Sequence, residues 1–154
     1  MSELAKNFQK VKNLVERLDS HYGIKTTLTL SDDDSYCRGG WSAAAGYKIW
    51  MSGTRLSTFY KKPFTEYYSV KHVWERFGYF GWHYAFTVDS DRFFACPGMT
   101  DDKHIWAVTL HEYAHVLDRG QHGHGKEYCD ILYNLIKQFP FSESLMQEQK
   151  PYWA

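Results

Sequence analysis

The sequence predicts one domain of the mixed α+β class, and three observations lead to that prediction. The chain has 154 residues, which is the usual length of a single domain. Apolar residues recur at helical spacing near both ends, whereas between them they alternate with polar residues as they do in strands. No internal repeat, low-complexity tract or linker divides residues 1–154, so we expect a single folded unit.

The first elements are predicted to be a helix followed by a strand. Apolar residues spaced by three and four positions mark one helical face, which ends at Gly23: Leu4, Phe8, Val11, Val15 and Leu18. From Ile24 to Leu30 apolar and polar residues alternate, which is typical of a half-buried strand. Residues 31–35 are rich in Ser and Asp and predict the turn that leaves this strand.

The middle of the chain predicts further strands and one helix. A second β stretch is expected to open at the glycine pair 39–40 and to run through residue 52. Residues 65–77 place four apolar side chains on one side of a predicted helix. Residues 82–88 alternate again, and Asp89-Ser90-Asp91 separates them from residues 92–96, which predicts a hairpin.

Two helices are predicted in the last third of the chain. Residues 100–102 supply a capping threonine and two acidic residues, and no Gly or Pro interrupts the chain until Gly120. After a glycine-rich turn, apolar residues up to Phe139 fall at helical spacing and stop before Pro140. The last dozen residues predict a tail without regular structure.

Composition excludes several classes of protein. The chain is 44% hydrophobic and 23% charged and has no apolar run long enough for a membrane span, so a soluble globular protein without a membrane partner is expected. Lysine plus arginine equals aspartate plus glutamate, at 18 each, so no global charge favours nucleic acid. The three cysteines, Cys37, Cys96 and Cys129, are too few and too widely spaced for a disulfide framework or a four-cysteine zinc ribbon. With no signal-peptide pattern at the N-terminus, an intracellular location, cytoplasmic or nucleoid-associated, is expected.

The chemistry-bearing motif is His111-Glu112-Tyr113-Ala114-His115, an H-E-x-x-H pattern inside the predicted helix 100–119. Histidines four residues apart project from the same face of a helix and can hold one ion together. Glu112 lies about 100° around the helix axis from His111, where it can take a proton from a metal-bound water without being a ligand. The motif predicts a catalytic zinc site.

Such a site has three protein ligands and one open position, so a third ligand must come from beyond the helix. The candidates are His122, His124 and Glu127. His124 is favoured because it stands between Gly123 and Gly125, where the backbone can turn tightly and direct the side chain back toward the helix.

The motif, followed by Gly123-His124-Gly125-Lys126-Glu127-Tyr128-Cys129, resembles the SprT-like zinc metallopeptidases, the family that includes Spartan, over about the last third of the chain. The resemblance implies one Zn²⁺ per chain, with zinc ligands His111, His115 and His124 and with Glu112 as general base. It implies that Tyr128 is the packing aromatic of the second helix. It also implies a zincin-like domain over residues 1–154, in which a small mixed or antiparallel sheet packs on the active-site helix and the C-terminal zinc ribbon of several relatives has no counterpart.

The leading hypothesis is therefore a zinc-dependent endopeptidase, a metalloprotease, that acts on proteins associated with nucleic acid. One alternative is a catalytically silent DNA-binding or scaffold module that keeps zinc only for folding. The other is a hydrolase that uses the same zinc chemistry on amides other than peptides, because the metal site does not itself specify a peptide bond.

Several roles around the site stay open in the sequence. His122, Arg119 and Tyr113 near the motif, and several more distant tyrosines, are all candidates for stabilising an oxyanion. Residues 83–88 or 48–52 are candidates for the sheet edge that receives an extended substrate. Asp118 would either orient a ligand imidazole or be a charge at the helix end that faces solvent.

Residues 48–76 carry a local positive charge, with six lysines and arginines against two glutamates. Aromatic residues are interleaved with these cations, as on surfaces that bind single-stranded nucleic acid. The ordinary interpretation is a solvated face over an aromatic core, and single-stranded DNA as a partner of this segment is a hypothesis beside it.

Overall fold

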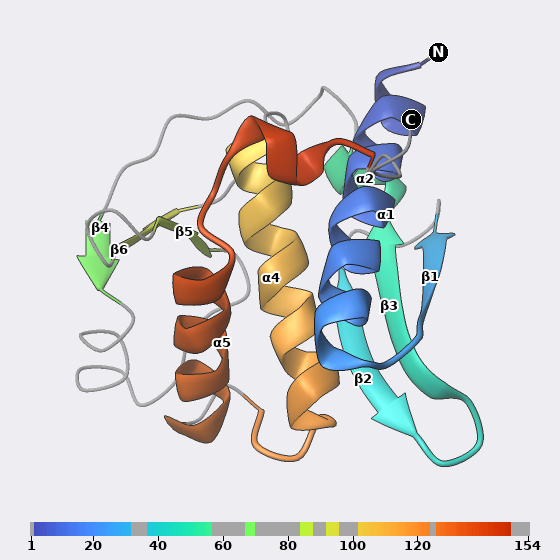
Figure 1. Ribbon diagram of the computed structural model, residues 1–154, viewed down its shortest axis with the longest axis vertical. Helices are drawn as coiled ribbons and strands as arrows, with labels where there is room; N and C mark the ends of the chain where they lie inside the picture. The colour runs from blue at the N-terminus through green and yellow to red at the C-terminus, as the bar shows by residue number, and fades with distance from the viewer. Residues whose placement is uncertain are drawn as a thin grey trace.

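The computed structural model describes residues 2–31, 37–56, 67–69, 84–87, 92–95, 102–123 and 126–148. These residues form an α+β arrangement in which helices pack against a small sheet (Figure 1). The helices are α1 (Glu3–Tyr22), α2 (Gly53–Leu56), α4 (Asp102–Asp118), α5 (Lys126–Gln138) and the 3₁₀ helix η1 (Glu143–Met146). The strands are β1 (Thr26–Ser31), β2 (Arg38–Ser42), β3 (Gly46–Ser52), β4 (Tyr67–Ser69), β5 (Tyr84–Thr87) and β6 (Arg92–Ala95).

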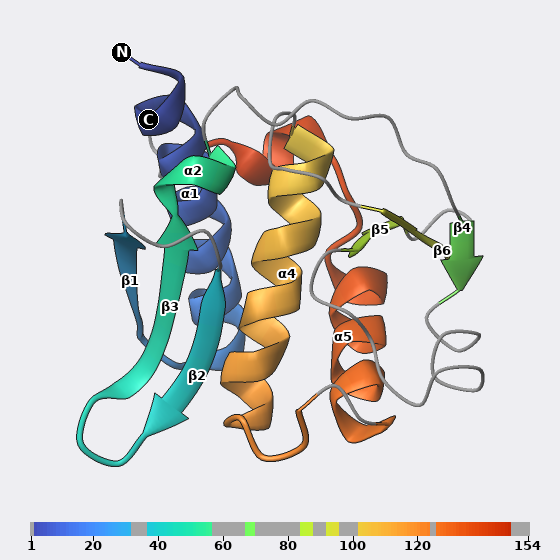
Figure 2. The same cartoon turned by 180° about the vertical axis from the view of Figure 1, so that it is seen from behind.

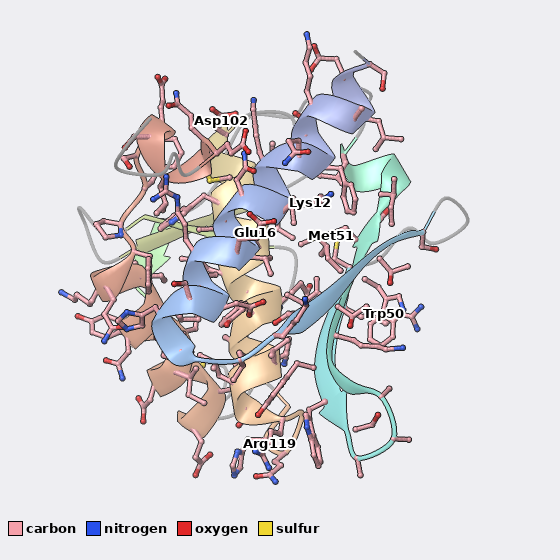
Figure 3. The ribbon with its side chains drawn as sticks, turned by 45° about the vertical axis from the view of Figure 1, so that its right-hand side comes forward. Lys12, Glu16, Trp50, Met51, Asp102 and Arg119 are labelled. Atoms are coloured by element: carbon pink, nitrogen blue, oxygen red, sulfur yellow. The ribbon has the colours of Figure 1, made fainter. Side chains whose placement is uncertain are left out.

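The sheet beside α4 is mixed and has the strand order β1-β3-β2. Strand β3 pairs in parallel with β1 and in antiparallel with β2, and Gly39 of β2 stands opposite Ile49 of β3. Ile49 and Met51 are fully buried on the inner face, whereas Trp50 points to the outer face (Figure 3). This alternation, which follows from the period of two in a strand, leaves one face of the sheet to the helices.

Helix α1 confirms the first predicted helix. The Ser2 side chain accepts a hydrogen bond from the backbone N–H of Ala5 at 3.1 Å and caps the helix, and Gly23 ends it with a φ of 68°. Its buried apolar face packs against α4 and the sheet: Val11, Leu14, Val15 and Leu18. Two buried asparagines bind backbone carbonyls of other segments, since the Asn7 amide donates to Leu56 O at 2.6 Å and the Asn13 amide to Met146 O at 3.0 Å.

Helix α4 lies between the sheet and α5 and is the most enclosed element (Figures 1 and 2). Residues 105–114 are all buried, because the sheet and α1 cover one side of the helix and α5 covers the other. The predicted stop is confirmed by Gly120, which has a φ of 67°. Helix α5 is amphipathic, as predicted, and buries Tyr128, Leu132, Leu135 and Ile136 against α4.

Three expectations about elements need correction. The β stretch 39–52 is two antiparallel strands, because the chain reverses at residues 43–45. The helix predicted over 65–77 is wrong at Tyr67–Ser69, which pair with β6 as strand β4, since aromatic residues also fit a pleated strand; the rest of that segment lies outside the described residues. Residues 143–146, expected in a tail, form η1 against α1 because Met146 finds a buried site there.

The predicted hairpin is confirmed as the antiparallel pair of β5 and β6, which with β4 forms a second sheet in the order β4-β6-β5. Of the turn predicted at residues 31–35, the structure describes only Ser31, and the rest lies outside the described residues. Within the described ranges, every helix is too short or too polar to traverse a lipid bilayer.

Candidate metal centre

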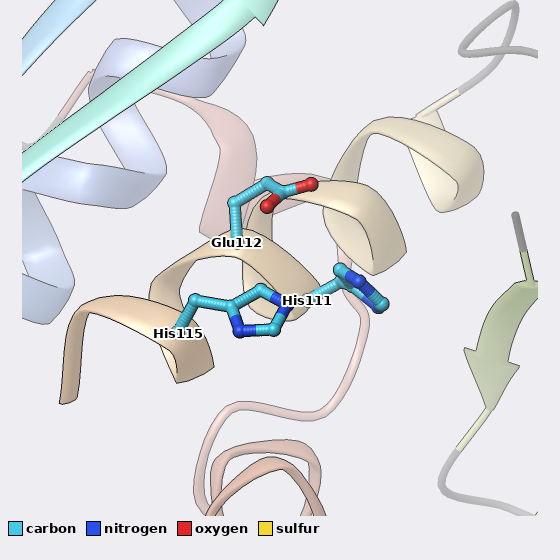
Figure 4. Close-up of side chains that lie close together, drawn as sticks. All are labelled: His111, Glu112 and His115. Atoms are coloured by element: carbon cyan, nitrogen blue, oxygen red, sulfur yellow. The ribbon is translucent and has the colours of Figure 1, made fainter. Parts of the chain in front are cut away.

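His111, Glu112 and His115 meet on one stretch of α4. Their ligand atoms, two imidazole nitrogens and a carboxylate oxygen, all lie within 4.8 Å of one another. The two imidazoles project beside each other and Glu112 leaves the helix at a different angle (Figure 4). The spacing of four residues produces this arrangement, because positions i and i+4 lie one above the other on a helix.

The donor atoms of this group, imidazole nitrogen and carboxylate oxygen, are of the types that bind zinc in proteins. Zinc in proteins takes imidazole nitrogen at about 2.0–2.1 Å and carboxylate oxygen at about 2.0–2.2 Å, so two donors on one ion stand no more than about 4 Å apart. Donors within 4.8 Å of one another need only a small side-chain adjustment to share an ion. His111 and Glu112 are buried and His115 is half-buried, so the site is accessible from the His115 side of the helix.

Tyr128 of α5 supports both histidines. Its ring is stacked on the His115 ring, with centroids 4.3 Å apart and planes 21° from parallel. Its hydroxyl donates a hydrogen bond of 2.9 Å to the backbone carbonyl of His111. The side chain is fully buried, and burial raises the pKa of the Tyr128 phenol well above its ordinary value, so the hydroxyl stays a donor. Tyr128 is thus the aromatic that packs α5 onto the motif.

Glu112 lies in a dry environment beneath β2. Its side chain is 2% exposed, and this burial raises the pKa of the Glu112 carboxyl to about 8. Gly39 of β2 passes so close that an added Cβ would overlap the Glu112 carbonyl oxygen and lie 3.0 Å from its carbonyl carbon. The absence of a side chain at Gly39 therefore allows the strand to close over the motif.

The third ligand is not placed by the structure, because His124 lies outside the described residues. Of the other two candidates, neither His122 nor Glu127 belongs to the group of potential metal ligands found among the described residues. The prediction of His124 as the third ligand therefore stays a prediction.

Asp118 orients His122 rather than a histidine of the motif. The buried Asp118 carboxylate accepts a hydrogen bond of 2.8 Å from the backbone N–H of His122 and lies 2.6 Å from the ring Nδ1. The alternative of a charge that faces solvent is wrong, because Asp118 is buried, and its carboxylate fixes the loop after α4 through His122. Contact with Asp118 raises the pKa of the exposed His122 imidazole.

Two of the three candidates for oxyanion stabilisation are engaged elsewhere. The Tyr113 hydroxyl donates to Asp19 Oδ1 at 2.9 Å, and the side chain is fully buried among residues of α1 and β1. The Arg119 guanidinium lies 4.7 Å from the centroid of the Trp41 ring and donates to the Tyr47 hydroxyl at 3.3 Å. Of these three residues near the motif His122 remains, with a side chain that is 42% exposed, and the distant tyrosines stay open.

One of the two predicted sheet edges is wrong, and the other falls on an outer strand that lies against α4. Residues 48–52 belong to β3, the central strand, so their backbone is paired on both sides and the prediction for them is wrong. Residues 84–87 form β5, an outer strand of the second sheet among the described strands. Strand β5 lies against α4, and so does β2, which is at the edge of its described sheet (Figure 2). The glycine pair 39–40 was its signal in the sequence.

The basic segment is described only in part, over residues 48–56 and 67–69. Within it the Lys48 ammonium lies 5.8 Å from the centroid of the Trp50 ring, and Arg38 of β2 approaches the same ring to 5.9 Å. An aromatic ring between two cations therefore stands on the outer face of the sheet.

Comparisons of the chain with protein-family models, with curated proteins and with solved structures found no match. The resemblance to the SprT-like metallopeptidases accordingly depends on the residues of the motif and of the segment that follows it.

Proposed function

We propose that the chain is a zinc-dependent endopeptidase of the H-E-x-x-H type, with His111, His115 and His124 as the zinc ligands and Glu112 as the general base. One observation carries the proposal: two imidazoles and one buried carboxyl of a single helix bring their ligand atoms within 4.8 Å of one another. Histidine spacing of this kind accommodates a metal, and a glutamate between the ligands is what hydrolysis requires in addition.

Zinc bound at this site would acidify a water molecule and polarise the carbonyl group of a substrate. Glu112 supplies the proton transfer, because its carboxylate accepts the proton of the attacking water and returns it to the leaving amine. A nearby cation favours the ionised carboxyl and opposes the effect of burial, which raises the pKa of Glu112 to about 8. Burial thus provides a carboxyl that exchanges its proton near neutral pH.

His122 is the oxyanion donor that the geometry favours. Asp118 lies 2.6 Å from its Nδ1 and raises the pKa of the imidazole, which favours the imidazolium, and the Nε2–H of the imidazolium can donate to a substrate oxygen. The substrate binds in an extended conformation along β2 by backbone hydrogen bonds, because this edge strand borders the helix that carries the motif.

Zinc content and cleavage of a denatured protein such as unfolded casein test the proposal together. The wild type is expected to hold about one zinc per chain and to cleave, Glu112→Gln to keep zinc without cleaving, and His124→Ala to lose most of the zinc. Glu127→Gln, an exposed change close by, is the control and is expected to retain both properties.

Other outcomes select the alternatives. Zinc in the wild type without Glu112-dependent hydrolysis of any amide would favour a zinc-stabilised binding module. Hydrolysis of small amides without cleavage of proteins would favour an amide hydrolase. A folded wild type without zinc would overturn the proposal.

A second proposal concerns single-stranded DNA and rests on the outer face of the sheet. Trp50 lies between Lys48 and Arg38, an arrangement in which the ring can stack on a base while the cations contact phosphates. We expect the wild type to bind a single-stranded oligonucleotide at low salt, with affinity falling as salt rises. Trp50→Ala is expected to weaken binding about tenfold, whereas Glu16→Gln on α1 is not. Binding that ignored salt or Trp50 would contradict this.

A further inference from the structure

Trp41 of β2 is an apolar side chain that is exposed to solvent on a strand beside the candidate metal centre. It is 39% exposed and is the one large hydrophobic side chain so exposed in the described part of the chain. It stands opposite Tyr47 in the antiparallel pair of β2 and β3, near the turn that joins them. An aromatic residue without cover on a strand that borders a candidate active site is a candidate for contact with a ligand.

Arg119 holds this ring in place. Its guanidinium lies 4.7 Å from the Trp41 ring centroid and 6.0 Å from the Tyr47 centroid, and it donates to the Tyr47 hydroxyl at 3.3 Å. The backbone of Arg119 has a φ of 56°, a left-handed conformation that side-chain-bearing residues seldom adopt. Strained residues of this kind persist where the surrounding contacts hold them. Here the Arg119 backbone N–H donates to Val116 O at 3.1 Å while its guanidinium lies near the two rings.

The position of Trp41 relative to the motif follows from the two elements that carry the pair. Gly39 lies against the backbone of Glu112, and Trp41 is two residues further on the same face of β2, about 7 Å along the strand. Arg119 lies seven residues after Glu112, about 10 Å along α4. Strand β2 and helix α4 run in the same direction (Figure 2). The Trp41 ring, held by Arg119, therefore lies just past the C-terminal end of the motif.

We propose that Trp41, fixed by Arg119, is a specificity-determining residue that receives a large apolar or aromatic side chain of the substrate within two residues of the scissile bond. The inference rests on the proposed peptidase function and on binding of the substrate along β2. A substrate strand paired with β2 projects alternate side chains toward the face that carries Gly39 and Trp41. The ring that is left partly open to solvent then gains an apolar partner.

The Arg119 guanidinium explains why an apolar substrate side chain suits the Trp41 ring better than a charged one. The Arg119 guanidinium already lies over two rings and donates to a hydroxyl, so it serves to hold Trp41 rather than to recognise a carboxylate. A basic substrate side chain would be repelled by the same group. Apolar complementarity of this kind discriminates between side chains by about tenfold or more.

The test is a cleavage-site profile of a peptide library from a digested proteome, read by mass spectrometry. The wild type is expected to enrich Phe, Tyr, Trp or Leu at one position within two residues of the cleaved bond. Trp41→Ala is expected to lose that enrichment and to cleave such peptides about tenfold more slowly, with zinc content unchanged. Trp41→Leu, which keeps an apolar side chain, is expected to retain part of the preference and covers the case in which the alanine variant does not fold.

Tyr133→Ala is the matched control, because Tyr133 on α5 also has a cation near its ring, Lys137 at 5.0 Å, but stands on another element. Its profile is expected to equal that of the wild type. Cleavage with an unchanged profile in both Trp41 variants would overturn this inference and leave the peptidase function standing. A wild type without Glu112-dependent cleavage would overturn both, so the two failures are distinguishable.

Discussion

The ring of Tyr128 on α5 is stacked on the ring of His115 on α4 at 4.3 Å between centroids, while the Tyr128 hydroxyl donates to the His111 carbonyl at 2.9 Å. One buried side chain thus touches both histidines of the motif, one through its ring and one through its backbone. The orientation of the two imidazoles depends on the packing of α5 as much as on α4 itself.

Separate parts of this contact can be removed. Tyr128→Phe keeps the stacked ring and loses only the hydrogen bond, so we expect it to lower the free energy of unfolding by about 1 kcal/mol and to keep its zinc. Tyr128→Ala removes the ring, leaves a cavity and frees the His115 imidazole, so we expect a loss of about 3–5 kcal/mol together with most of the zinc affinity. Chemical denaturation and zinc titration measure both effects. Equal zinc affinity in both variants would show that the stack does not orient His115.

Gly39 and Gly40 form a matched pair on β2. Gly39→Ala would place a methyl group into the backbone of Glu112, so we expect it to destabilise the fold by about 1–3 kcal/mol and to reduce cleavage. Gly40→Ala meets no atom within 4 Å and is expected to change stability by no more than about 0.5 kcal/mol. The measurements are thermal unfolding and initial cleavage rates. If both alanines behaved alike, close passage of β2 over Glu112 would not be a requirement of the site.

Helical periodicity and the motif allowed the site helix to be predicted from the sequence. The long runs of α1, α4 and α5, with glycine stops after α1 and α4 and Pro140 after α5, are local signals that tertiary packing reinforces. The pairing of His111 with His115 follows from helix geometry alone. These features depend on residues that are close in sequence.

Relationships between distant segments were not predictable in the same way. That β2 passes over Glu112, or that Arg119 lies over Trp41, depends on how the hairpin packs on α4, for which the sequence carries no local signal beyond Gly39. The aromatic spacing at residues 67–69 fits a helix and a strand equally, and pairing with β6 decided the matter.

The side of α4 that faces away from the histidines makes a separate prediction. Tyr113 donates to Asp19, whose carboxylate also accepts hydrogen bonds from the backbone N–H and the hydroxyl of Thr26, so one carboxylate joins α1, β1 and α4. Tyr113→Phe removes a hydrogen bond to this carboxylate and is expected to cost about 1.5–3 kcal/mol in the free energy of unfolding. Tyr133→Phe on α5 is the control, with a change of about 0.5 kcal/mol or less expected.

Zinc content separates this structural role from a role in the site. We expect the Tyr113→Phe variant to bind zinc and to cleave as the wild type does at temperatures where it is folded. A loss of cleavage rate without a loss of stability would instead assign the Tyr113 hydroxyl to the chemistry.

The contact between Asp118 and His122 predicts a dependence on pH. The hydrogen bond and the charge of Asp118 raise the pKa of the His122 imidazole above its ordinary value of 6.5. A raised pKa in the folded state means that the pair stabilises the fold fully below the unfolded pKa of His122. This contribution is lost as the pH rises through the higher, folded pKa.

Titration of the His122 ring by NMR in zinc-free protein measures this shift directly. We expect Asp118→Asn to lower the pKa of His122 toward 6.5, because the substitution removes the negative charge that favours the imidazolium. Glu16→Gln, which removes one exposed charge from α1, is expected to leave it in place. Since Asp118 also accepts from the backbone N–H of His122, its replacement should loosen the loop that leads to residue 124 and weaken zinc binding as well. A His122 pKa that did not respond to Asp118→Asn would show that the carboxylate does not hold this ring in solution.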